Sequence, residues 1–188
     1  MDCVELLIEA KSPIDRKNED EQTPLHLATI NGRIDVVKYL LKRDRNEIMN
    51  EDEDSNTPIH LACMNKRYKT LEVLLKYGAD VHCRNTKKWT PLDCAGNQYL
   101  QSCINIMNQF LNHIHPASVG SIECAELLLQ NSATIDPVDR SKTTPLHLAA
   151  ENGHAKMIEL LLDYGADITM EDINSRNALE RAILSGRK

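Results

Sequence analysis

A four-residue phrase returns along this chain at nearly constant spacing. It reads TPLH from Thr23, TPIH from Thr57, TPLD from Thr90 and TPLH from Thr144, and a degenerate copy, NALE, begins at Asn177. The steps between the first residues are 34, 33, 54 and 33. A fixed period near 33 residues is typical of stacked repeats, in which the apolar face of each unit is buried against the next unit. We therefore predict a solenoid and not a single rounded core.

Each phrase has the features of a helix start. The threonine is a suitable N-cap, and the proline fits the first helical position, where no amide hydrogen is needed. Asn-Gly pairs at Asn31-Gly32 and Asn152-Gly153 predict the end of this first helix, because both residues tolerate the left-handed conformation. Lys66 stands where the second full copy should have glycine, so we expect strain there.

A second helix and a polar loop complete each unit. Apolar residues follow the Asn-Gly turns at helical spacing and predict the second helix. Five residues before each phrase the chain has Asn or Asp, whose short side chains can bond to nearby backbone and fix a turn. These residues are Asn18, Asp52, Asn85, Asp139 and Asp172.

With its period, its TPLH phrases and these turns, the chain resembles the ankyrin repeat family over its whole length. The resemblance implies an all-α solenoid of stacked helix-turn-helix units with β-turn or hairpin finger loops. A single array is expected, with partial repeats at 1–22 and 177–188 and full repeats at 23–56, 57–89, 90–143 and 144–176.

Both ends of this array stop inside a repeat. Apolar residues there are expected to lack a covering neighbour: Leu6, Leu7 and Ile8 at one end, and Leu179, Ala182 and Ile183 at the other. Terminal repeats normally have polar outer faces. We therefore expect a piece of a longer array; the alternative is a pair of irregular but complete end repeats.

The third full repeat is longer than the others by 21 residues, and removal of 98–118 restores the register. Gly120 then falls at the expected turn between the helices. The stretch from Cys94 to Ile122 has no charged side chain. Three interpretations stay open for the insertion: an added helix that docks a partner, a tolerated surface loop, or a translated intron or variable exon.

Charge and hydropathy limit the class of partner and compartment. The net charge of −6 argues against a nucleic-acid partner. No run of 18 apolar residues occurs, so we expect no direct membrane insertion. No secretory leader opens the chain, which favours a cytoplasmic location. The six cysteines form no C-x-x-C pair and are interpreted as buried, reduced thiols.

No set of residues indicates catalysis, and we predict no catalytic, cofactor-binding or metal-binding residue and no enzyme activity. His26, His60 and His147 recur once per repeat, so they are expected to pack on the neighbouring repeat and not to converge on one ion. The pair His113 and His115 lacks the paired cysteine spacing of a zinc site. Phosphate-binding loops and nucleophile motifs are absent from the sequence.

One finger offers a candidate partner-binding site. It contains Arg84, Lys87, Lys88 and Trp89, the only tryptophan, and it follows an acidic finger at 51–54. The residues that precede the phrase in the other copies are polar, which predicts an exposed tryptophan. Exposed tryptophan beside lysine is a plausible hot spot for a protein partner. The alternative is a tryptophan that lies flat on its own finger.

The family resemblance implies a noncatalytic protein-interaction or scaffolding module that binds through the concave face of fingers and first helices. A narrower resemblance is carried by 88–92, 142–154 and 177–188, which are similar to late repeats of the transient receptor potential subfamily A cation channels. It implies, as an alternative, the cytosolic sensory region of such a channel. That family's reactive cysteines cannot be placed on any cysteine of this chain, so none is carried over. The partner and the oligomeric state stay open.

Overall fold

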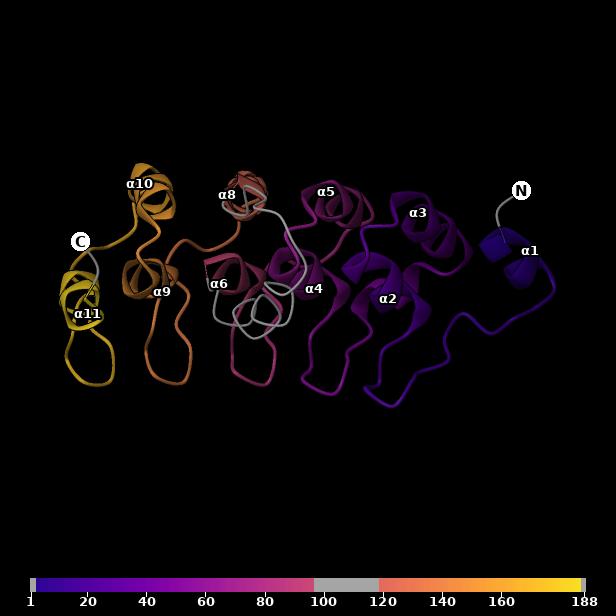
Figure 1. Cartoon of the computed structure of the whole chain (residues 1–188), viewed down its shortest axis with the longest axis horizontal. Helices are drawn as coiled ribbons and strands as arrows, with labels where there is room; N and C mark the ends of the chain where they lie inside the picture. The colour runs from indigo at the N-terminus through magenta and orange to yellow at the C-terminus, as the bar shows by residue number, and fades with distance from the viewer. Residues whose placement is uncertain (1–2, 97–118, 187–188) are drawn as a thin grey trace, which may run out of the picture.

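The computed structural model describes residues 3–96 and 119–186 of the 188, and helices are stacked along one axis (Figure 1). The first helices of the repeats form one row, and the second helices form another beside it. The first row holds α2 (Pro24–Ile30), α4 (Pro58–Met64), α6 (Pro91–Gly96), α9 (Pro145–Asn152) and α11 (Ala178–Leu184). The second row holds α3 (Ile34–Arg43), α5 (Tyr68–Lys76), α8 (Val119–Gln130) and α10 (Ala155–Asp163), and α1 (Cys3–Glu9) lies apart at the N-terminal end.

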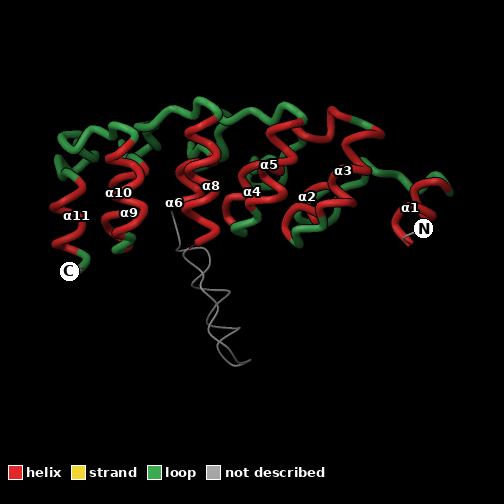
Figure 2. Tube along the Cα trace, turned by 90° about the horizontal axis from the view of Figure 1, so that it is seen from above, coloured by secondary structure: helices red, strands yellow, loops and turns green. Residues whose placement is uncertain are grey.

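This arrangement confirms the predicted all-α solenoid. Seen from above, the helices lie side by side, with the connections between repeats along one edge (Figure 2). No strand occurs in 3–96 or 119–186, so the fingers are turns and not hairpins. A short 3-10 helix, η1 (Arg45–Met49), follows α3. The insertion proposed for 98–118 lies outside the described residues.

Each first helix begins where its phrase predicts, and the reason is a reciprocal cap. In α9 the Thr144 hydroxyl accepts from the backbone N–H of His147, and the Thr144 N–H donates to His147 Nδ1 at 3.2 Å. In α11 Asn177 and Glu180 make the same exchange with different side chains, the Asn177 N–H donating to Glu180 Oε2 at 2.8 Å. Two otherwise unpaired amides are thus satisfied at each helix start.

The core lies between the two rows of helices. Leu25, Ile59, Leu92 and Leu146 occupy the third position of each phrase and are almost fully buried. The second helices supply Leu40, Leu74, Leu128 and Leu161 against them, equally buried. These residues belong to one continuous hydrophobic cluster, as expected when each repeat covers the next.

Helix α8 differs from its sister helices at its start. Helices α3, α5 and α10 each begin eleven residues after the first residue of their phrase, at Ile34, Tyr68 and Ala155. Helix α8 has 12 residues and already includes Val119. The prediction that Gly120 forms the turn between helices is therefore wrong, because Gly120 lies within the first turn of α8.

The predicted strain at Lys66 is present. This residue has φ of 56°, in the left-handed region where Gly32 and Gly153 have φ of 67° and 73°. A side chain costs about 1–2 kcal/mol in that conformation, whereas glycine adopts it freely but loses more chain entropy on folding. The net strain at Lys66 is therefore on the order of 1 kcal/mol or less.

Replacing Lys66 by glycine is expected to raise the free energy of unfolding by up to about 1 kcal/mol, because it removes this strain. Urea denaturation followed by circular dichroism measures the change. Gly153→Ala is the matched opposite substitution and should destabilise by about 1 kcal/mol. A lower denaturation midpoint for Lys66→Gly than for the unchanged protein would contradict the assignment of strain to this turn.

Candidate functional site

The fingers are held by the Asn or Asp that recurs five residues before each phrase. In the third finger Asn85 Oδ1 accepts from the backbone N–H groups of Lys87 and Trp89, both at 3.0 Å. Asn18, Asp52, Asp139 and Asp172 accept the equivalent pair of bonds in their own fingers. The predicted turn chemistry is therefore confirmed, and every finger presents its tip in the same orientation.

Adjacent fingers are also joined to each other. The N–H of Thr86 donates to the carbonyl of Asp54 at 2.9 Å, and the N–H of Glu53 donates to Asp20 at 3.2 Å. A buried side-chain bond also joins the second and third fingers, because Asn85 Nδ2 donates to Asn56 Oδ1 at 2.9 Å. These bonds make the fingers a continuous surface and not a set of independent loops.

The recurring histidines join one repeat to the next, as predicted. His60 Nδ1 accepts from the Thr57 N–H at 3.2 Å, so the ring proton lies on Nε2, which donates to the Trp89 carbonyl at 3.0 Å. His26 and His147 repeat this bridge to the carbonyls of Asn56 and Arg176. Burial lowers the pKa of all three histidines, which keeps them neutral near pH 7 and suits this donor role.

Asp93 takes the histidine position in the third full repeat and cannot make the same bridge. Its Oδ2 accepts from the Thr90 N–H and hydroxyl at 2.7 and 2.8 Å, so the helix cap is kept. Its Oδ1 is buried and has no hydrogen-bond partner among the described residues. Burial raises the pKa of Asp93 to about 7, against the opposing effect of the Thr90 bonds.

The structure places Trp89 differently from the prediction of an exposed side chain. Its side chain is half-buried, packs against the core cluster and donates through Nε1 to Asp139 Oδ2 at 3.2 Å. The expectation was wrong because the residue before each phrase is drawn inward by its backbone. Its N–H is held by the finger Asn or Asp, and its carbonyl accepts from the histidine. Asn56 and Thr143, at the same position, are buried as well.

The other predicted site residues lie around this tryptophan in different environments. Lys87 Nζ stands 4.9 Å from the centre of the Trp89 ring, within the range of a cation–π contact. Arg84 donates to the carbonyls of Lys88 and Val138, at 2.7 and 2.8 Å, and so ties the third finger to the next. Lys88 has φ of 65° at the finger tip, where its side chain is exposed.

An open pocket of about 240 Å³ lies beside Trp89, between the second and third fingers and the first helix α4. Leu61, Met64 and Asn65 of α4 and the following turn line one side. The fingers complete it with Gln22, Asp52, Asp54, Asn56, Asn85, Thr86, Lys87 and Trp89. The pocket thus combines an apolar patch with acidic and basic walls.

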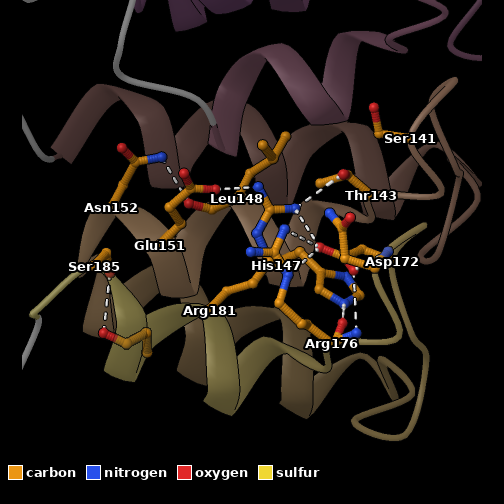
Figure 3. Close-up of polar contacts among 12 residues, drawn as sticks. Ser141, Thr143, His147, Leu148, Glu151, Asn152, Asp172, Arg176, Arg181 and Ser185 are labelled. Atoms are coloured by element: carbon orange, nitrogen blue, oxygen red, sulfur yellow. Dashed lines mark hydrogen bonds and ion pairs between the residues drawn. The ribbon is translucent and has the colours of Figure 1, made fainter.

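A second polar cluster, centred on Arg181, was not predicted from the sequence. Figure 3 shows its guanidinium between Thr143, Glu151 and Asp172. It donates to Thr143 Oγ1 at 2.9 Å, bonds to Glu151 and lies 3.7 Å from Asp172 Oδ2. Burial alone would raise the pKa of Asp172, but hydrogen bonds from Arg176 and from backbone amides reverse this effect and lower it.

The Arg181 cluster joins α11 to the repeat before it. A signal for it exists in the sequence, because Arg181 occupies the register position of Leu27, Leu61 and Leu148 in other repeats. A cation at an apolar position of a repeat indicates a local ion-pair partner, and here that partner comes from α9 and the preceding finger.

Within 3–96 and 119–186, no group of three or more His, Cys, Asp or Glu side chains is arranged to hold a metal ion. Among these residues, the helices are all too short or too polar to cross a membrane. Cys63 and Cys94 are fully buried, and burial raises the pKa of both thiols well above the ordinary value, which makes them unreactive.

The chain belongs to the ankyrin repeat family. The family model described as "Ankyrin repeats (3 copies)" matches residues 1–85, 46–116 and 113–188, which together cover the chain. Ankyrin repeats form a protein-interaction fold that is typically noncatalytic, so this is a module of the protein-binding class.

Individual relatives are much longer proteins. The chain is 26% identical, over 98% of its length, to transient receptor potential cation channel subfamily A member 1 of Drosophila melanogaster, of which it covers 11%. It is 33% identical, over 88% of its length, to human ankyrin repeat and SOCS box protein 16, of which it covers 34%. A shorter match of 53 residues, at 40% identity, is to the Caenorhabditis elegans homolog of the same channel, of which it covers 4%.

Proposed function

We propose that this chain is a noncatalytic binding module that holds an extended segment of a protein partner on its concave face, in the pocket between the second and third fingers. The observation that carries this proposal is the pocket itself, with Trp89 and Lys87 on one wall and Asp54 on the other. The half-buried tryptophan ring is already fixed by Asp139 and Lys87. An aromatic side chain that is already fixed loses little conformational entropy when a partner binds. Trp89 therefore suits the role of a binding hot spot.

The charges that flank the pocket indicate the chemistry of the partner. Glu51, Glu53 and Asp54 are exposed on the second finger, and Lys87 and Lys88 are exposed on the third. A segment that crosses from one finger to the other would therefore present a cationic residue to the former and an anionic residue to the latter. Between them, Leu61 and Met64 favour an apolar side chain. This pattern is more specific than net charge alone, because it sets the direction of the bound segment.

Trp89→Ala is expected to weaken partner binding roughly tenfold or more, since the loss of a central tryptophan commonly costs at least this much. The measurement begins with a peptide library selected on the unchanged protein, followed by calorimetry of the selected peptides with each variant. Trp89→Phe keeps an aromatic ring but loses the bond to Asp139, and it should lose less affinity. Tyr164→Ala, at an exposed aromatic residue in the turn after α10 and away from the pocket, serves as the control.

Equal affinity of the selected peptides for the unchanged protein and for Trp89→Ala would overturn this assignment. Circular dichroism melting of each variant separates a binding defect from a folding defect. Lys87→Glu adds a second arm, because it reverses one wall of the pocket without removing the ring. The Lys87→Glu variant should no longer select peptides with an anionic residue at the third finger. The apolar residue of the selected peptides should stay the same.

The alternative function is the cytosolic sensory region of a transient receptor potential subfamily A channel. The observation that favours it is the match to the fly channel over 98% of this chain, supported by the short nematode match. In such a protein this module would lie on the cytoplasmic side of the membrane. Transcript sequence beyond the codon for Lys188 tests this alternative: six hydrophobic spans downstream would support it, and a further soluble domain would exclude it.

A further inference from the structure

Most neighbouring fingers are joined at the same two places. A histidine of one repeat donates to the carbonyl of the residue before the next phrase, which is Asn56, Trp89 or Arg176. In addition, the amide one residue after the finger Asn or Asp donates to a carbonyl of the previous finger. These backbone bonds run from Glu53 to Asp20, from Thr86 to Asp54 and from Ile173 to Ser141, at 3.2, 2.9 and 2.9 Å.

The joint between the third and fourth fingers has neither of these bonds. The third finger leads into α6 and the fourth into α9 (Figure 1). Asp93 replaces the histidine here, and its Oδ1 has no hydrogen-bond partner among the described residues. The register pairs the Arg140 N–H with the Lys87 carbonyl, but no backbone bond joins them in the described structure. Along the described fingers, both recurring bonds are therefore missing at this joint alone.

Two side-chain bonds hold the joint instead. Arg84 Nη1 donates to the Val138 carbonyl at 2.8 Å, and Trp89 Nε1 donates to Asp139 Oδ2 at 3.2 Å. The Arg84 side chain is exposed and the Trp89 side chain is half-buried. Exposed hydrogen bonds resist local opening less than buried ones, because water replaces them. This joint is therefore the weakest of those that the fingers form.

Behind these two bonds lies a carboxyl group that is 0% exposed, that of Asp93. Its Oδ2 accepts from the N–H and the hydroxyl of Thr90, but Oδ1 is left without a partner. In the ionised form the group therefore places a charge and an unpaired acceptor in the interior, which is costly. Opening of the joint would admit water to Oδ1, and the protonated group has no charge to hydrate. The ionised form thus favours an open joint.

The charged groups of the fingers do not remove this cost. Arg84 of the third finger favours the ionised form of Asp93, and Asp139 of the fourth finger opposes it. Burial has the largest effect and raises the pKa of Asp93 to about 7. On α6 itself, Cys94 stays a neutral thiol, because burial raises its pKa well above the ordinary value.

The helices packed on α6 also bring no counter-charge to Asp93. His60 of α4 and His147 of α9 cap the flanking first helices, and burial lowers the pKa of both, which keeps them neutral near pH 7. The carboxylates on α8 and α9 lie elsewhere: Glu123 and Glu126 line a separate groove, and Glu151 bonds to Arg181. Hydration is therefore the remaining way to stabilise ionised Asp93.

We propose that the joint between the third and fourth fingers is a proton-controlled hinge, closed when Asp93 is protonated and opening when Asp93 loses its proton. Fingers one to three stay bonded to one another, as do fingers four and five, so the hinge separates two groups of fingers. The preference for the closed form is complete below pH 3.8 and is lost as the pH rises through about 7. This inference does not depend on the proposed partner, because its test needs none.

Amide hydrogen exchange of the full chain, followed by NMR, gives the opening constant of single amides after correction for the intrinsic rate at each pH. The N–H groups of Thr90 and Thr144 report on the hinge, because they start the first helices on its two sides. Their opening constants should rise about tenfold from pH 6 to pH 8, as expected for a pKa of about 7 in the closed form and 3.8 in the open form. The Thr57 N–H, at a joint with the histidine bridge, should not show this rise.

Three variants identify the group and the place. Asp93→Asn keeps an acceptor for Thr90 but cannot ionise, so its opening constants should be the same at pH 6 and pH 8. Asp35→Asn removes an exposed carboxylate of α3 and should keep the rise of the unchanged protein. Arg84→Ala removes one of the two bonds across the hinge and should raise the opening constants of Thr90 and Thr144 about fivefold at either pH.

Opening constants of Thr90 and Thr144 that stay level from pH 6 to pH 8 in the unchanged protein would overturn the proposal. The same rise in Asp93→Asn would also overturn it, because another group would then be responsible. An equal rise at Thr57 would mean that the whole array opens and not one joint. An Arg84→Ala variant that opens no more than the unchanged protein would contradict the separation of these two fingers.

Discussion

Replacing Asp93 by histidine is expected to stabilise the protein at pH 8 by on the order of 2–4 kcal/mol. Asp93 is 0% exposed, its Oδ1 has no partner among the described residues, and burial raises its pKa to about 7. Histidine at this position should keep the cap on Thr90 through Nδ1. It should also donate through Nε2 to the Thr143 carbonyl, as His60 donates to Trp89 and His147 to Arg176.

The pH dependence of this gain follows from the direction of the pKa shift. A carboxyl whose pKa is raised on folding binds a proton more tightly in the folded state, so its contribution to stability is complete below the unfolded pKa of 3.8. That contribution is lost as the pH rises from 3.8 through about 7. The histidines have lowered pKa values, and the stability they contribute is instead lost as the pH falls below 6.5. The advantage of Asp93→His should therefore be largest at pH 8 and smallest near pH 5.

Urea denaturation of the unchanged protein and of Asp93→His across this pH range is the measurement. Asp93→Asn is the matched control, because it removes the charge but adds no ring. The stability of Asp93→Asn should not fall between pH 5 and 8. It should stay below that of Asp93→His, because asparagine does not make the full bridge to the Thr143 carbonyl. If the unchanged protein and Asp93→His have parallel stability profiles from pH 5 to 8, then Asp93 is ionised throughout and the assignment is wrong.

The fold was largely predictable because each repeat specifies its own local structure. Threonine and proline start a first helix, and the finger Asn or Asp closes a turn with nearby backbone, so both signals act within five residues. The histidine bridge was also predictable in outline, since a residue that recurs once per repeat must serve the contact between repeats. Five copies in register carry this information together.

The parts that the sequence did not predict depend on contacts between distant residues. The Arg181 cluster joins side chains 30 and 38 residues apart, and no local rule sets their distance. Trp89 was expected to be exposed from the polar residues at its register position. Residue type gave the wrong answer because the backbone bonds at that position, to Asn85 and His60, determine its direction. The start of α8 was mispredicted because it follows the one connection whose length departs from the repeat.

His60→Ala is expected to destabilise the protein by about 3 kcal/mol. The substitution leaves the Thr57 N–H without its partner, removes one of the two hydrogen bonds that the Trp89 carbonyl accepts, and opens a cavity at a residue that is 0% exposed. Because the Trp89 carbonyl fixes the base of the third finger, the same change should loosen the pocket and weaken partner binding even where the protein stays folded.

Two further variants separate these effects in urea denaturation. His60→Asp keeps an acceptor for the Thr57 N–H but loses the bridge to Trp89, which reproduces the arrangement at Asp93. It should recover part of its stability when the pH is lowered from 8 to 5, whereas His60→Ala should not. His82→Ala removes an exposed histidine and should change the stability by less than about 0.5 kcal/mol. A cost for His60→Ala as small as that of His82→Ala would mean that the bridges between repeats contribute little, and that hydrophobic contact alone holds the fingers in place.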